Sequence, residues 1–471
     1  MSNPSVQGAG PASGRQGKLV PLIIAASFFI EELDSTIITT SLPRMAQSLG
    51  ETSTALGSAI TVYLLSVAVF LPLSGWVADR FGARRIYCAA IMIFALGSLI
   101  CGAAQSFPVL MAGRLIQGLG GALMTPIGRL IVVRSVPKEQ LVVASNYMIA
   151  PALIGSMLGP VIGGFITTYF SWRWNFFINV PLAVLGLALT LRFVEDPVPT
   201  TEAKPFDTLG FTIIAIGLAA AQVAVEYLGR HHASIFGAAG LLAGAAVMFA
   251  AYVGHARRRV HPLLDLALFR TRTFAISVLV GGIARIAVGA LPFLLPLLFQ
   301  LGFGLDPFES GLLTVASALG VFSMRVGVSL ALRIISMRTI ILGNTVILTA
   351  LMTGLVLIDA ETPHWAIFGY LFVIGALRSV EFSNITALGY ADLSQKEMSA
   401  ATTIITLVTR FCLCGGIGLG ATLLSVFSHP GATTQEDFVP VFLILAGTLL
   451  LSALGFTRLR RDDGRQLSAR R

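Results

Sequence analysis

The stretch GWVADRFGARR, Gly75 to Arg85, joins the end of one long apolar segment to the start of the next. Its glycines are Gly75 and Gly82, and its charged residues are Asp79, Arg80, Arg84 and Arg85. Charged side chains are too costly to leave in hydrocarbon, so this turn is expected where a lipid bilayer meets water. The glycines allow two helices to approach closely, and the charges can pair across the gap. The stretch therefore predicts a turn between two membrane-spanning helices.

The composition excludes a soluble globular protein. Of the 471 residues, 55% are hydrophobic and only 12% are charged, whereas soluble domains carry roughly 25% charged residues. Each membrane-spanning helix needs about 20 largely apolar residues. The chain is thus expected to be an all-α polytopic membrane protein with fourteen spans, at 19–43, 57–78, 86–104, 107–133, 141–168, 175–194, 209–229, 235–254, 274–301, 309–332, 338–358, 364–390, 398–427 and 438–457.

The basic residues predict topology rather than nucleic-acid binding. The net charge is +9, and most Lys and Arg fall in loops on one side of the predicted membrane, including the run 257–259. This positive-inside pattern places that side, and both termini, in the cytoplasm of a bacterial-type inner membrane. The expected partners are therefore anionic lipids, with no nucleic acid. We expect a monomer.

No cofactor or metal site is predicted. The four cysteines, Cys88, Cys101, Cys412 and Cys414, lie in apolar segments without a nearby His cluster and are interpreted as small packing residues. The sequence also contains no nucleotide-binding loop and no nucleophile motif. The chain is therefore not expected to be an enzyme, and no nucleotide site in it is expected to supply energy.

The loops divide the chain into five parts. The polar residues 1–18 are expected to be disordered, and residues 458–471 form a basic tail. Six spans fall in 19–195 and six in 274–457. Residues 196–273 link the two units through two extra spans, followed by a segment with apolar residues among charges, which predicts a short amphipathic helix on the membrane surface. This order, six plus two plus six, predicts two bundles with the substrate site between them near the midplane.

The first span contains three acids. Asp34, in LDSTIITTSLP, must face protein or a water-filled cavity, and a carboxyl group there can carry a proton. The alternative is a hydrogen-bonded carboxylate that only locks the helices together. Glu31 shares the face of Asp34, whereas Glu32 points about 100° away. Both could bind a cationic substrate or split proton binding into two steps, and the alternative is that one pairs with an intramembrane arginine.

Two further spans carry polar or small residues at helical spacing. In LMAGRLIQGLGGA, Arg114 needs an acidic or carbonyl partner, and Gln117 lies on its face and could line a substrate cavity. In GSMLGPVIGG, Gly155, Gly159 and Gly163 make a side-chain-free ridge for close helix contact. Pro160 permits a bend there, and Gly164 extends the small surface.

The second unit also contains charges within its spans, namely Arg285, Arg325, Arg378, Glu381 and Arg410. Arg378 and Glu381 are three residues apart, so they could form a local ion pair. The alternative places Glu381 in the central cavity, opposite Glu31. The roles of the four arginines stay open.

These motifs resemble those of the major facilitator superfamily. Gly75–Arg85 resembles the G-x-x-x-D-R-x-G-R-[RK] turn between its second and third helices, and Leu33–Pro43 resembles a signature of its fourteen-helix drug/proton antiporters, with Thr39 and Ser41 departing from it. Leu110–Ala122 resembles its L-x-x-x-R-x-x-Q-G-x-G-x-A motif, and Gly155–Gly164 resembles the motif of its exporters. The second unit resembles the family only in its spans and in the surface segment ending LFRTRTF.

The resemblance implies proton-coupled efflux of small amphipathic organic compounds, including drugs, by alternating access. It implies that Arg114 takes part in proton coupling, for which Asp34 is the expected partner and Glu31 a further candidate. Asp79, Arg80 and Arg84 would hold the cytoplasmic side closed. Two alternatives remain: proton-coupled uptake or export of one metabolite, and a receptor or scaffold that keeps the fold without transport.

Overall fold

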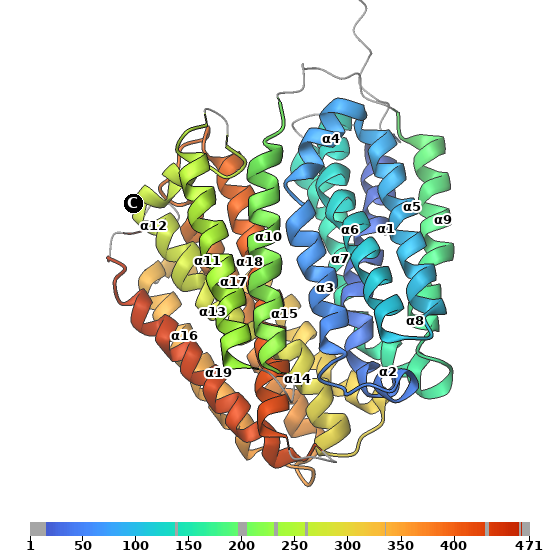
Figure 1. Ribbon diagram of the computed structural model, residues 1–471, viewed down its shortest axis with the longest axis vertical. Helices are drawn as coiled ribbons and strands as arrows, with labels where there is room; N and C mark the ends of the chain where they lie inside the picture. Colours follow the sequence, from blue (N-terminus) through green and yellow to red (C-terminus); the bar gives the residue numbers. More distant parts are fainter. Residues whose placement is uncertain are drawn as a thin grey trace, which may run out of the picture.

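The computed structural model describes residues 16–136, 140–195, 205–229, 234–259, 262–334, 336–428, 433–460 and 463. Most of the two predicted polar ends, 1–18 and 458–471, and the side chain of Arg325 lie outside the described residues. Every regular element in the described ranges is a helix. The helices run side by side and form one bundle, with the first half of the chain on one side and the second half on the other (Figure 1).

The elements of the first half and the linker are α1 (Gln16–Ile37), η1 (Ile38–Thr40), α2 (Leu42–Leu49), α3 (Gly57–Phe70), α4 (Leu73–Phe81), α5 (Ala83–Ala103), α6 (Phe107–Ser135), α7 (Leu141–Tyr169), α8 (Trp174–Phe177), α9 (Asn179–Phe193), α10 (Thr208–Leu228), α11 (Ile235–Ala256) and η3 (Leu266–Arg270). Those of the second half are α12 (Arg272–Ala275), η4 (Ile276–Val280), α13 (Gly281–Gly289), α14 (Leu291–Leu297), η5 (Leu298–Gly302), α15 (Pro307–Ile334), α16 (Met337–Gly354), η6 (Leu355–Leu357), α17 (His364–Tyr390), α18 (Met398–Phe427) and α19 (Gln435–Phe456).

Membrane spans can be counted from helix length and composition. Among the described residues, 12 helices are long and apolar enough to cross a membrane, or 13 if the bent pair α3–α4 is one span. The bend of 56° precedes the Gly75–Arg85 stretch, which runs from the short helix α4 through Gly82 into the start of α5 and does not follow a straight span. Helix α1 is outside this count because it carries Glu31, Glu32 and Asp34. The number fourteen stays a prediction, with α1 as the additional span.

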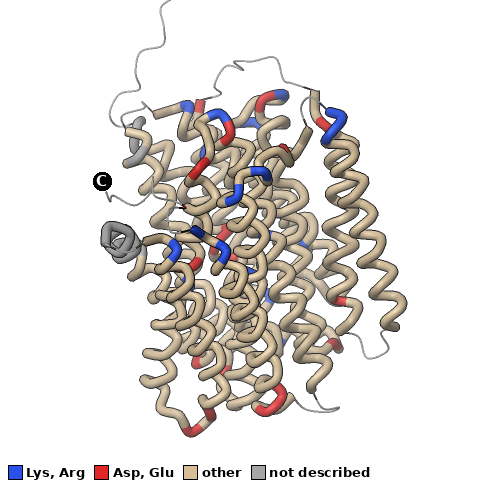
Figure 2. Tube along the Cα trace, turned by 90° about the vertical axis from the view of Figure 1, so that its left-hand side faces the viewer, with Lys and Arg blue, Asp and Glu red and all other residues tan. Residues whose placement is uncertain are grey.

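The charges are unequally distributed between the two ends of the bundle. Lys and Arg concentrate toward the end that carries α4, called the α4 end below, whereas the opposite end, which carries α2, shows mainly Asp and Glu (Figure 2). A cytoplasmic end is typically the basic one. This distribution favours the predicted topology, with the α2 end outside.

Helix α7 packs directly on α1 through its glycines. A Cβ atom at Gly155 would lie 2.6 Å from the carbonyl oxygen of Phe29, and one at Gly163 would lie 2.1 Å from that of Ile37. At Gly159 it would lie 1.9 Å from Thr36 Oγ1. Gly164 faces the other half of the chain, where a Cβ would lie 2.2 Å from the carbonyl oxygen of Pro307. Small residues are required at all four positions for this spacing of helices.

Replacing Gly159 by leucine is expected to destabilise the fold by about 1–3 kcal/mol or more, since the added side chain must push α1 away. Gly447→Leu is the matched control, because a Cβ at Gly447 in α19 meets nothing within 4 Å. Size-exclusion chromatography and thermal unfolding of the purified variants measure the effect. Equal yields and melting temperatures for the two variants would contradict the close α1–α7 contact.

The extra helices α10 and α11 pack against each other, and α10 also contacts α3 and α18. Helix α10 thus lies along the line where the two halves meet (Figure 1). The segment after α11 differs from the prediction of a surface helix. It forms the short 3-10 helix η3, and Leu264 and Leu268 are buried with residues of α10, α11 and α18. Its apolar side chains therefore pack against the protein, where they bury area more completely than at a lipid surface.

Asp207 ties this linker together at the start of α10. Its carboxylate accepts hydrogen bonds from the backbone N–H of Gly210 at 3.1 Å and of Leu263 at 3.3 Å, and it lies 2.7 Å from His255 Nε2. Burial acts to raise the pKa of Asp207, but these hydrogen bonds outweigh burial and hold the pKa below its usual value of 3.8. The ionised side chain therefore stabilises the junction of α10, α11 and the following segment.

Asp207→Ala is expected to lower the free energy of unfolding by about 1–2 kcal/mol, because the helix cap is lost. A carboxyl group with a lowered pKa stabilises the fold above its unfolded-state pKa and loses this effect as the pH falls through the folded-state value. The advantage of the wild type over the variant should therefore shrink as the pH falls below 3.8 toward the lower folded-state pKa. Asp207→Asn, which keeps the cap but cannot ionise, is the control. Thermal unfolding as a function of pH measures both, and a constant difference at all pH values would refute the assignment.

Candidate functional site

Asp34 and Arg114 form a completely buried ion pair within the first half. Arg114 Nη1 lies 2.7 Å from Asp34 Oδ2, and both side chains are 0% exposed. The Arg114 guanidinium also donates to the carbonyl oxygen of Ala59 at 2.8 Å and lies 4.4 Å from the centre of the Tyr63 ring. The carbonyl partner and the carboxylate partner that the sequence requires for Arg114 are thus both present.

Asp34 is held by further donors. Its Oδ1 accepts hydrogen bonds from Gln117 Nε2 at 2.7 Å and from Asn179 Nδ2 at 2.6 Å. Gln117 is itself fully buried, and its amide also accepts from Arg114 Nη1 at 2.6 Å. In this conformation Gln117 therefore belongs to the network around Asp34 and does not line a cavity. Asp34 faces protein on all sides and has no contact with solvent.

Glu31 and Glu32 meet an arginine of the other half. Glu31 accepts a hydrogen bond from Thr125 of α6, and its second oxygen lies 3.9 Å from Arg410 Nη2 on α18. Glu32 Oε1 lies 3.8 Å from the same nitrogen. The side chains of Glu32 and Arg410 are 33% and 24% exposed, in contrast to that of Glu31 at 4%. Two carboxylates thus share one guanidinium across the boundary between the halves, at distances longer than those around Asp34.

The charges of α17 do not form the local pair that their spacing allows. Glu381 accepts hydrogen bonds from Asn344 Nδ2 at 2.6 Å and Thr345 Oγ1 at 2.7 Å, both on α16. The local ion pair with Arg378 is therefore wrong for this conformation, because neutral donors on the neighbouring helix satisfy the carboxylate. Glu381 is 2% exposed, so it does not line the central cavity here either.

Arg378 lines a cavity of about 120 Å³ between the halves, together with Thr36, Thr39 and Ser156 of the first half and Thr314 and Ser317 of the second. Its remaining wall is apolar and includes Leu153 and Leu295. Ligand pockets for drug-sized molecules are typically ≈ 300–1,000 Å³. The cavity would therefore have to widen before it could hold such a molecule.

Arg285 of α13 is 2% exposed and donates to the carbonyl oxygen of Ser277 and to Thr386 Oγ1, both at 3.2 Å. These contacts tie α13 to η4 and α17. Both acceptors are neutral and belong to the second half, so in this conformation Arg285 serves to hold helices of that half together.

The turn between α4 and α5 makes its contacts within the first half. Asp79 Oδ1 lies 2.8 Å from Arg134 Nη2 of α6. Arg84 donates to the carbonyl oxygen of Leu191 in α9, while Arg80 and Arg85 are exposed. Gly82 adopts a positive φ of 92°, which favours glycine at this sharp turn. The turn thus joins α4, α6 and α9 at the α4 end.

A sequence model described as Major Facilitator Superfamily matches residues 24–421. The chain belongs to the major facilitator superfamily. The protein named "Putative multidrug resistance protein MdtD" in Pectobacterium atrosepticum is 36% identical over 452 residues, which cover 94% of this chain and 96% of the relative. The protein of the same name in Escherichia coli O6:H1 is 35% identical over 461 residues, which cover 95% and 96%.

Solved structures of the superfamily have the same fold. The POT family transporter PepTSo superposes with a TM-score of 0.70 at 15% identity, covering 95% of this chain and 98% of that one. The nucleoside transporter NupG superposes with a TM-score of 0.64 at 15% identity, covering 94% and 100%.

This membership settles the class of the protein. It is a multi-span membrane transporter and not an enzyme, and its bacterial relatives are consistent with the inner membrane. Its substrates are small molecules, and transporters of this superfamily generally need no cofactor.

The roles of several residues in the charge network were not predicted from the sequence. Asn179 and Thr125 contribute hydrogen bonds to Asp34 and Glu31, but neither residue stands out in its apolar segment. Arg410 is recognisable as a charge within a span, but its partners lie in α1, near the opposite end of the chain, so its sequence neighbours do not indicate them. A polar amide within a span is the signal that could have indicated Asn179.

Proposed function

We propose that this protein exports small amphipathic organic compounds in exchange for protons. The relatives that carry the name of a multidrug resistance protein support the substrate class and the direction of transport. Three acids in one membrane-spanning helix support the coupling to protons, because such costly groups in a membrane mark ion pathways by default.

The observation that carries the proposal is the sharing of Arg410 by Glu31 and Glu32. These ion pairs join α18 of the second half to α1 of the first. Protonation of Glu31 would remove one negative charge and weaken the link, so proton binding would favour separation of the halves. Release of the proton on the other side would restore the pairs. A proton thus controls the movement by which alternating access occurs.

Asp34 and Arg114 form the second part of the proposed coupling site. The pair is sealed from solvent here, so Asp34 can take up a proton only in a conformation in which the pair has opened. The Asp34–Arg114 pair joins the same two helices, α1 and α6, as the contact between Glu31 and Thr125. Movement of α1 relative to α6 would therefore disturb both acids together. A carboxylate that only locks the packing remains the alternative for Asp34.

The substrate would bind between the halves, where Glu32 is partly exposed and where the cavity beside Arg378 would widen. Gln117 and Glu381 would contribute only in a conformation that frees them. Asp79, Arg80 and Arg84 would help to close the cytoplasmic end. We place the two bundles at 19–195 and 274–457, with both termini in the cytoplasm, and infer a monomer surrounded by lipid.

The proton motive force is sufficient for such export. One proton that moves down a potential of about 100 mV yields about 2.3 kcal/mol. Because about 1.4 kcal/mol corresponds to a tenfold change, one proton sustains a roughly fifty-fold gradient of a neutral substrate.

Transport into inverted membrane vesicles tests this proposal. Imposing a proton gradient, with the acidic side inside the vesicle, should drive accumulation of a fluorescent organic cation, and a protonophore should abolish it. Vesicles from cells without the protein are the control. Gradient-driven uptake in right-side-out vesicles instead would show an importer, and no proton-linked flux across a broad substrate panel would favour a non-transporting membrane protein.

A further inference from the structure

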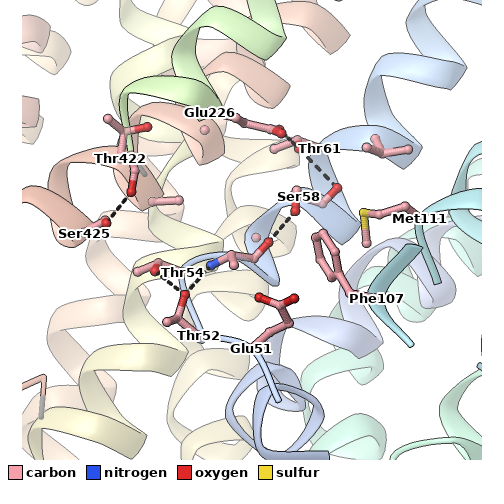
Figure 3. Close-up of a pocket in the computed structure, with 16 residues that line it drawn as sticks. Glu51, Thr52, Thr54, Ser58, Thr61, Phe107, Met111, Glu226, Thr422 and Ser425 are labelled. Atoms are coloured by element: carbon pink, nitrogen blue, oxygen red, sulfur yellow. Dashed lines mark hydrogen bonds between the residues drawn. The ribbon is translucent and has the colours of Figure 1, made fainter. Parts of the chain in front are cut away.

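A second cavity, of about 600 Å³, lies at the α2 end. Its walls come from three parts of the chain: the first half, through α3, the loop before it and the start of α6; the second half, through α18; and the extra helix α10. Figure 3 shows Glu226 and Glu51 at opposite edges of this space, with Phe107 and Met111 along one side. The volume is that of a site for a drug-sized molecule.

Glu226 of α10 is the half-buried acid of this cavity. Its Oε1 accepts hydrogen bonds from Thr61 of α3 and, at 3.0 Å, from Gln222 Nε2 (Figure 3 shows the first). Among the described residues, Oε2 accepts no hydrogen bond and the carboxylate has no ion-pair partner. A carboxylate in such a place is incompletely compensated, since charged groups at this depth ordinarily pair with an opposite charge.

The residues that line the cavity favour a positively charged ligand. Among the described residues, 16 line the cavity; none of these is a Lys or Arg, whereas two, Glu51 and Glu226, are acids. The ring of Phe107 offers a face that attracts cations, and the thioether of Met111 is soft and polarisable. Beside the wall at Gly418, Gln222 is buried with an amide oxygen that has no partner among the described residues. The Gln222 amide oxygen and Glu226 Oε2 thus both lack a donor among the described residues.

Helix α10 is fixed to both halves around this cavity. Thr61 of the first half donates to Glu226, and Thr422 of the second donates to the carbonyl oxygen of Val225 at 2.7 Å. Ser425 donates to the carbonyl oxygen of Gly229 at 2.5 Å. The extra helix therefore supplies the acid, and both halves supply the walls.

We propose that this cavity is a binding site for a small organic cation with an apolar body, held by the Glu226 carboxylate and the Phe107 ring. The same chemistry could come from a dissolved ammonium or phosphonium compound or from the ammonium headgroup of a lipid. The proposal assigns to α10 a part in ligand binding. It deepens the proposed function, on which it rests for the substrate class, but it places the cation in this cavity and not in the cavity beside Arg378.

The test is binding of tetraphenylphosphonium to the purified full-length protein in a neutral detergent, measured by equilibrium dialysis. Glu226→Gln should weaken binding by about tenfold or more, since the only half-buried charge is lost, and Glu226→Asp should bind within a few-fold of the wild type. Glu361→Gln, at an exposed acid of another loop, is the matched control and should bind normally. Unchanged binding in Glu226→Gln overturns the proposal.

A second measurement locates the cation. The cysteine of Ser58→Cys would line the cavity, whereas the four native cysteines are buried. A positively charged thiol reagent should modify it faster than a negatively charged one, and tetraphenylphosphonium should protect it. If tetraphenylphosphonium gives no protection and Glu32→Gln loses binding instead, the cation binds beside Glu32 and the proposed site is refuted. Displacement by phosphatidylethanolamine but not by phosphatidylglycerol would identify the ligand source as lipid.

These measurements need no proton gradient. Binding at Glu226 without transport would disprove export and leave the site intact. Transport with normal coupling but without cation binding in this cavity would disprove the site alone.

Discussion

Arg114→Ala is expected to destabilise the protein by about 3–5 kcal/mol and to abolish transport. The substitution removes the guanidinium from a buried ion pair and leaves Asp34 charged and unpaired in a space with no solvent contact. Gln117 and Asn179 donate to Asp34 but carry no charge, so they cannot replace the lost partner. Thermal unfolding of purified protein and substrate flux in proteoliposomes measure the two effects.

The double variant Asp34→Asn/Arg114→Gln separates the causes. It removes both charges and keeps groups that can hydrogen-bond, so most of the lost stability should return while transport stays absent. Arg257→Ala, at an exposed basic residue of the linker, is the control and should behave as the wild type. An Arg114→Ala protein as stable as the wild type would show that the ion pair contributes nothing to the fold.

Glu31→Gln is expected to uncouple transport from the proton gradient. Glutamine keeps the shape and can still contact Thr125, but it cannot lose a proton and cannot pair with Arg410 as an ion. Accumulation driven by the proton gradient should fall from roughly fifty-fold to none, while exchange of labelled for unlabelled substrate continues. Proteoliposome assays measure both activities.

The exchange activity is the internal control, because a misfolded protein would lose it as well. Glu195→Gln, at an exposed acid after α9, is the matched variant and should remain coupled. Full gradient-driven accumulation by Glu31→Gln would remove Glu31 from the coupling step.

The fold follows from local sequence features to a large degree. The fold class could be predicted because each of its signals lies within one short stretch of sequence. These signals are the apolar segments, the charged turn at Gly75–Arg85 and the glycines of α7. The bend between α3 and α4 was not predicted, although Pro72, which lies between the two helices, is the residue type that ordinarily causes such a bend.

The contacts within the site could be predicted only in part, because they depend on how each helix is rotated about its axis. The meeting of Asp34 and Arg114 could be predicted because each residue requires a partner and few charges are available in the membrane. The hydrogen-bond donors to Glu381 could not be predicted, because Asn344 and Thr345 are neutral residues of another helix. Glu226 was overlooked near the end of an apolar segment, although an acid within a span is a recognisable signal.

The central claim is that the ion pairs of Arg410 with Glu31 and Glu32 hold the halves together until a proton arrives. The most direct measurement is the distance between spin labels at Glu195→Cys and Lys396→Cys, two exposed positions on opposite halves, as the pH is lowered. The wild type should shift to a second distance in acid, and Glu31→Gln/Glu32→Gln should show that second distance at every pH. A double variant that still changes distance with pH as the wild type does would contradict the claim.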